Sequence, residues 1–184
     1  MKKILFLILL IIPNIAMSYE TAKYEVAKTI SDKIEIREYK NMVLATISTD
    51  EESPNNNFRT LFKFISGGNN QEQEIKMTTP VFQQNVSNKQ SMSFVMPDSF
   101  AKGAIPKPNN KNIKIEILKN TKFIVIRFSG RSVDKNFNKY QKVLESAIEE
   151  NGLKADLDNP INAYYNAPWT IPSFKRNEVL FRLN

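Results

Sequence analysis

One pattern of residues occurs twice and decides the fold: KIEI at 33–36 followed by MVLATIS at 42–48, and KIEI at 114–117 followed by FIVIRFS at 123–129. These short runs are rich in β-branched and aromatic residues, which is typical of β-strands. Each copy predicts two strands separated by a short turn. The turns are expected at residues 39–41 and 120–122, because polar residues interrupt both copies there.

A helix is predicted after each copy. The first helix is expected to begin with Ser53 as its N-cap, ahead of Pro at the first helical position, and to end at the Gly pair 67–68. The second helix is expected to use Asp134 as its N-cap and to end at residues 151–152, Asn followed by Gly. Both helices precede segments that favour extended structure, at residues 75–84, 92–96, 162–167 and 178–183.

Each half of the chain therefore has the order strand, strand, helix, strand, strand. The halves cover residues 22–97 and 113–184, approximately, and neither has enough apolar surface to fold alone. We expect one α+β domain over residues 19–184, in which the two repeats share a core and form a distorted antiparallel β-barrel flanked by two helices. The Pro- and Asn-rich segment 97–112 is predicted to be a loop, either a lid over the barrel or a linker.

The first 18 residues have the layout of a secretory signal peptide. Two lysines precede the apolar run 4–12, and small residues stand at Ala16 and Ser18. The run is shorter than the ~20 residues of a transmembrane helix. Cleavage after Ser18 and export to a periplasm or out of the cell are expected, with an uncleaved anchor as the alternative. No integral membrane span is expected in the remaining chain, which is predicted to be a monomer.

The composition excludes several classes of protein. The 184 residues contain no Cys and no His, so thiolate nucleophiles, zinc fingers, His general bases and imidazole metal ligands are all excluded. The net charge of +7 comes from 26 Lys and Arg against 19 Asp and Glu. These charges are scattered and form no basic stripe, so we expect no nucleic-acid binding.

Several residues are candidates for a binding site. The first predicted helix carries an inward apolar stripe, with Arg59 and Lys63 on another face, where they could pair with carboxylates of a flat apolar ligand or simply face solvent. Met77 could contact a soft or aromatic ligand or fill the core. Glu178 could form a structural ion pair with Arg176. The apolar stripe consists of Phe58, Leu61, Phe62 and Ile65.

The chain resembles the SOUL haem-binding protein family over almost all of residues 22–184. The ordered set of strings is more specific than any one of them. The strings are FR at 58–59, LFKFISG at 61–67, IKMTTPV at 75–81, FVMP at 94–97, YYNAPWT at 164–170 and RNEV at 176–179.

The resemblance implies a barrel of two repeats, related to bacterial effector-binding domains, and a non-covalent site for haem or a related tetrapyrrole. In that site an apolar groove beside the first helix would hold the porphyrin, and Lys63 and Arg59 would lie near its propionates. The groove would consist of Phe58, Leu61, Phe62 and Ile65. Because this chain has no His, an iron ligand could come only from Met, Tyr or Lys, or from no side chain.

Three hypotheses for function follow. The leading one is an exported, non-enzymatic protein that binds haem for carriage or buffering. The alternative is a module that binds another apolar small molecule or a partner protein. The third is a small hydrolase that uses carboxylates and Tyr, for which Glu35, Glu116 and Glu178 are the candidate acids. Glu35 and Glu116 occupy equivalent positions of the repeat and are expected on the strand surface.

Overall fold

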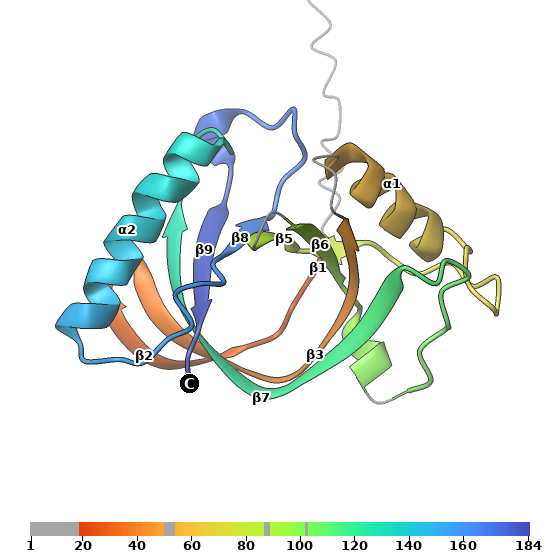
Figure 1. The fold of residues 1–184 in the computed structure, drawn as a ribbon, viewed down its shortest axis with the longest axis horizontal. Helices are drawn as coiled ribbons and strands as arrows, with labels where there is room; N and C mark the ends of the chain where they lie inside the picture. Colours follow the sequence, from red (N-terminus) through yellow and green to blue (C-terminus); the bar gives the residue numbers. More distant parts are fainter. Residues whose placement is uncertain (1–18, 50–53, 87–88, 102) are drawn as a thin grey trace, which may run out of the picture.

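The computed structural model describes residues 19–49, 54–86, 89–101 and 103–184, so the predicted signal peptide and the Ser53 cap lie outside the described residues. This part of the chain contains two α-helices and nine strands (Figure 1). The elements are β1 (Glu20–Thr21), β2 (Glu25–Ser31), β3 (Ile34–Thr49), α1 (Pro54–Ile65), β4 (Thr78–Thr79), β5 (Val81–Val86), β6 (Lys89–Val95), the 3₁₀ turn η1 (Asp98–Ala101), β7 (Ile113–Phe128), α2 (Asp134–Glu150), β8 (Ile161–Tyr164), η2 (Pro172–Phe174) and β9 (Asn177–Arg182).

Six strands close into an antiparallel barrel. The pairing runs β3, β6, β5, β8, β9, β7 and returns from β7 to β3, so each strand has a partner on both sides. β2 pairs with the first half of β3 at the edge of the sheet. β1 pairs with β4 in a separate parallel ladder. Both helices cover the outside of the sheet, at opposite ends of the molecule (Figure 1). The predicted α+β barrel with two flanking helices is confirmed.

The two predicted turns inside the repeated pattern are wrong. β3 and β7 are continuous strands of 16 residues each, and they pair with each other over almost their whole length. The ladder skips one position, between the pairs Tyr39–Thr121 and Asn41–Lys119. At this position Asn120 has a positive φ of 46°, a conformation that Asn tolerates better than most residues. The polar residues at these positions therefore mark an irregularity within two long strands, and not the turns between four short strands that the sequence predicts.

The irregularity reverses which side chains of β3 face the barrel interior. In its first half Tyr39 faces the interior cluster and Ile36 packs toward α2. In its second half Leu44 faces the interior and Val43 packs toward α1. The reversal occurs where two consecutive residues of β3, Lys40 and Asn41, are both exposed, which breaks the usual alternation of side chains with a period of two. Each long strand thus contributes to three apolar clusters: one inside the barrel and one under each helix.

The ends of the helices differ in detail from the prediction. Asp134 is the first residue of α2, and its predicted role as N-cap is wrong, because Val133 holds that position without a side-chain hydrogen bond. α1 ends at Ile65, ahead of Gly67, whose φ of +98° suits a residue without a Cβ. The segment predicted as a lid or linker contains η1, and its later part lies beside the end of α1, where the Asn109 amide donates to the Gly68 carbonyl.

None of the helices in the described ranges combines the length and the apolar character that crossing a bilayer requires.

Candidate functional site

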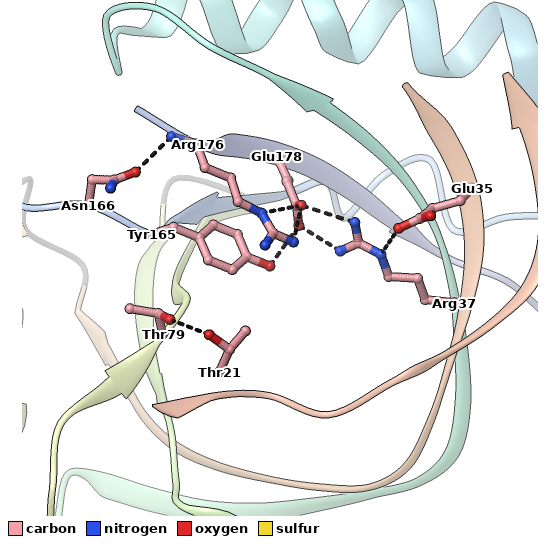
Figure 2. Close-up of polar contacts among 8 residues, drawn as sticks. All are labelled: Thr21, Glu35, Arg37, Thr79, Tyr165, Asn166, Arg176 and Glu178. Atoms are coloured by element: carbon pink, nitrogen blue, oxygen red, sulfur yellow. Dashed lines mark hydrogen bonds and ion pairs between the residues drawn. The ribbon is translucent and has the colours of Figure 1, made fainter. Parts of the chain in front are cut away.

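Arg37 of β3 and Glu178 of β9 form an ion pair inside the barrel (Figure 2). Arg37 Nη1 lies 2.7 Å from Glu178 Oε2, and Nη2 lies 3.0 Å from Oε1, which is the bidentate geometry of a strong guanidinium–carboxylate pair. Both side chains are buried, at 2% and 0% exposure. The position follows from strand periodicity, because Leu180, two residues beyond Glu178, belongs to the interior cluster.

Glu178 has two further partners. The Tyr165 hydroxyl donates to Oε2 at 2.7 Å, and Arg176 places Nε 2.9 Å and Nη2 2.7 Å from Oε1. The predicted ion pair between Arg176 and Glu178 is confirmed. The backbone amide of Arg176 donates to Asn166 Oδ1 at 2.7 Å, which fixes the start of β9 against the end of β8 (Figure 2).

The guanidinium groups also lie on aromatic rings. Arg37 lies 4.2 Å from the ring centroid of Tyr24, and Arg176 lies 4.0 Å from that of Tyr165. Glu35 closes the network on the other side, since its Oε1 accepts from Arg37 Nε at 2.5 Å. Glu35 is therefore a partner of the buried arginine, which the prediction of a surface strand position did not anticipate.

The pairing sets the ionisation of the cluster. Burial alone would raise the pKa of Glu178, but hydrogen bonds and charge from Arg37, with the charge of Arg176, outweigh burial and hold this pKa below its usual value. Burial raises the pKa of the Tyr165 hydroxyl, with a further contribution from the charge of Glu178, and raises that of Tyr39 to about 12. At neutral pH Glu178 is therefore a carboxylate between two guanidinium groups, and the hydroxyls of Tyr165 and Tyr39 are neutral.

The lowered pKa of Glu178 predicts a pH dependence of stability. A carboxyl group that titrates lower in the folded chain contributes stability above its unfolded pKa, and this contribution is lost as the pH falls through the folded pKa. We expect the free energy of unfolding to decline as the pH falls from about 5 to 3, and to decline less in Glu178→Gln. Urea unfolding at several pH values measures both slopes. Equal slopes in the two proteins would contradict the prediction.

The cluster as a whole has the features of a structural network. Every buried side-chain nitrogen or oxygen in the described part of the chain has a hydrogen-bond partner. Both oxygens of Glu178 already accept from its neighbours, so a substrate would reach the carboxylate only by displacing Arg176 or Tyr165. The arrangement supplies a polar, fully paired end to an otherwise apolar barrel interior.

A different surface is formed by the flank of α1. Phe58 and Phe62, one turn apart, are 40% and 50% exposed, and their rings stack with centroids 6.1 Å apart and planes 12° apart. Phe58 also meets the buried ring of Phe94 on β6 edge-on at 5.3 Å. Arg59 and Lys63 follow each Phe by one residue and are exposed beside this pair.

The structure separates the residues that the sequence had grouped together. Leu61 and Ile65 are buried in the core under α1, together with Phe64, which the predicted stripe omitted. The prediction that Phe58 and Phe62 point inward is wrong, because both side chains are half-exposed at one edge of the row that Leu61, Phe64 and Ile65 bury. Met77 is partly buried against the same core cluster. We refer to Phe58, Arg59, Phe62 and Lys63 as the α1 flank.

An open cleft of about 750 Å³ lies near the start of the described chain, between the N-terminal segment, the middle of β3 and η1. Its walls carry ion pairs, between Lys23 and Asp98 at 2.7 Å and between Lys40 and Glu25 at 2.6 Å. None of the predicted site residues lines it. A cleft with charged walls is poorly matched to a flat apolar ligand.

Comparison with known families decides the identity. The model of the family described as SOUL heme-binding protein matches residues 19–182. This chain belongs to that family. The match confirms the resemblance drawn from the sequence strings, and it makes haem binding a possible function of the chain.

Solved structures with the same fold have little sequence in common with this SOUL chain. The C-terminal domain of EcmrR has a TM-score of 0.61 at 14% identity, over 83% of this chain and 97% of that one. A hydrolase encoded by lin2189 from Listeria innocua has a TM-score of 0.59 at 11% identity, over 83% and 92%. At these identities the likeness shows the fold alone. None of the curated proteins searched matches this sequence significantly.

The α1 flank offers groups that suit both the apolar and the anionic parts of a haem, which neither the barrel interior nor the charged cleft does. Two stacked rings offer an exposed apolar face, and two exposed basic side chains adjoin it. The barrel interior does not fit, because apolar side chains and the Arg37–Glu178 pair fill it. The chain contains no imidazole that could ligate iron.

Proposed function

We propose that this protein binds haem or a related tetrapyrrole non-covalently on the α1 flank and has no enzymatic activity. The observation that carries the proposal is the stacked, half-exposed pair Phe58–Phe62 beside Arg59 and Lys63, in a chain of the SOUL family. When bound, the haem would supply the iron centre, and the protein would supply the surface that holds it.

Each part of the α1 flank has a distinct task in this proposal. The rings of Phe58 and Phe62 would bury their exposed surface against one face of the porphyrin, and apolar burial contributes about 25 cal/mol per Å². Arg59 and Lys63 are one helical turn apart, so their charged groups could reach two propionates on the same edge. Neither has an ion-pair partner among the described residues, so neither must break a contact to bind an anion.

The absence of His shapes the expected mode of binding. Since no imidazole can ligate the iron, contacts with the faces and edges of the macrocycle must supply most of the affinity. Met77 remains a candidate contact, although its partly buried position against the core gives it less freedom than the exposed residues of the α1 flank. An exported protein with such a site would serve haem carriage or buffering.

The basic residues of the α1 flank provide a direct prediction. Lys63→Glu is expected to weaken haemin binding about tenfold, because it replaces a propionate partner by a repelling charge. Lys142→Glu on α2 makes the same charge change at another exposed helical position and is the matched control. Absorbance titration with haemin measures both. If the two variants bind alike, the propionates do not lie at Lys63.

Mass spectrometry of ligands that copurify with the chain addresses the alternative function. Recovery of a porphyrin supports the proposal. Recovery of a different apolar molecule, together with no saturable haemin binding, would replace haem by that molecule.

A further inference from the structure

The loop between β8 and β9 exposes an unusual amount of apolar surface. Within residues 166–176, which we call the aromatic loop, Trp169 is 85% exposed, Phe174 75% and Ile171 61%. In the described part of the chain these are the most exposed of the large apolar side chains. Large apolar side chains clustered on a surface indicate a site of contact with a partner or a membrane.

The aromatic loop has a defined backbone. The Thr170 amide donates to the Ala167 carbonyl at 3.0 Å, and the Phe174 amide donates to the Ile171 carbonyl at 2.9 Å within η2. The Gly130 amide donates to the Pro172 carbonyl at 2.9 Å, which ties the loop to the segment before α2. The apolar side chains therefore project from a turn that hydrogen bonds already hold in place. Burying them against a partner requires little further ordering of the backbone.

The surroundings of the aromatic loop are basic. The segment before α2, held beside the loop by the Gly130 contact, carries the exposed side chain of Arg131. The first turn of α2 adds the exposed side chains of Lys135 and the acidic Asp134. The segment before α2 also adds Val133, which is 45% exposed. Lys175 follows η2 and donates from Nζ to the Pro168 carbonyl. The loop and the start of α2 lie at the same end of the molecule (Figure 1).

We propose that the aromatic loop inserts into the interface of an anionic lipid bilayer. Trp and Phe side chains favour the boundary between headgroups and acyl chains, and basic side chains around them are attracted to anionic headgroups. The net charge of +7 favours the same surface and opposes association of two copies. Haem binding on the α1 flank is a separate property, and the proposal does not depend on it.

The chain provides its own probe of insertion. Trp169 is the only tryptophan in the sequence, so tryptophan fluorescence reports on the aromatic loop and on no other part of the chain. We expect its emission to shift to the blue when purified protein is added to vesicles of phosphatidylglycerol and phosphatidylethanolamine. We also expect quenching by lipids brominated near the headgroup, and a weaker response to phosphatidylcholine vesicles. Because the readout is local, binding through another segment would leave the emission unchanged.

Variants separate insertion from other causes of a shift. Phe174→Ser is expected to weaken vesicle binding about fivefold and Arg131→Glu to weaken it for anionic vesicles only. Ile117→Ser, at a 46% exposed position on β7, is the matched control and is expected to bind as the parent does.

Three results would overturn the proposal. The first is an unchanged emission spectrum in the presence of anionic vesicles. The second is equal vesicle binding by Phe174→Ser and the parent. The third is a blue shift that depends on protein concentration without lipid, which would assign the aromatic loop to contact between copies of the chain.

Discussion

Glu178→Gln is expected to lower the free energy of unfolding by about 3–5 kcal/mol, which is typical when one partner of a buried ion pair is removed. The substitution keeps the shape of the side chain but removes the charge that compensates Arg37, which is 2% exposed. Glu35 would remain beside Arg37, but it contacts only Nε and is itself partly exposed. Urea unfolding of the parent and the variant measures the difference.

An exposed ion pair serves as the control for this loss. Glu25→Gln removes the same charge from a pair with Lys40 at 2.6 Å, in which both side chains are about two-thirds exposed. Solvent screens such pairs, so this variant is expected to be as stable as the parent. If both variants lose the same amount of stability, burial of the Arg37–Glu178 pair is not what makes it important.

The double variant Phe58→Ser/Phe62→Ser is expected to weaken haemin binding about thirtyfold. Each ring has about half of its surface left to bury, which is worth about 1 kcal/mol per ring, and each 1.4 kcal/mol changes the dissociation constant tenfold. Its fold should persist, because Leu61, Phe64 and Ile65 attach α1 to the barrel and are unchanged. Circular dichroism and a thermal melt establish that the double variant is folded before binding is measured.

Val143→Ser is the matched control for the aromatic pair. Val143 is 44% exposed on α2, so the substitution removes a similarly exposed apolar side chain from the other helix. It is expected to bind haemin as the parent does. A loss of affinity in Val143→Ser equal to that of the double variant would show that haemin binds to exposed apolar surface without preference for the α1 flank.

The fold was largely predictable because local signals agree with its architecture. The repeated β-rich pattern, the two helices and the short strands after each helix all have periodicities that survive in the structure. The two long strands were not predictable as continuous elements. Their alternation changes phase at Lys40 and Asn120, and a phase change has the same local signature as a turn between two strands.

The buried cluster shows where a single sequence stops being informative. Arg37 and Glu178 are 141 residues apart, and strand periodicity alone does not pair two positions so far apart in the sequence. The one usable signal was the local pair Arg176–Glu178, which the sequence did predict. The sequence predicted a helix that carries the apolar and basic residues of the α1 flank. It did not predict which row of apolar side chains packs on the sheet, because that depends on the position of the helix on the barrel.

The most direct test of the account is an absorbance titration of haemin into the parent protein and the Phe58→Ser/Phe62→Ser variant side by side. The account predicts a saturable change in the Soret band at one haemin per chain in the parent. It also predicts an affinity about thirtyfold weaker in the folded variant. A parent without saturable change, or a variant that binds as tightly as the parent, would contradict haem binding on the α1 flank.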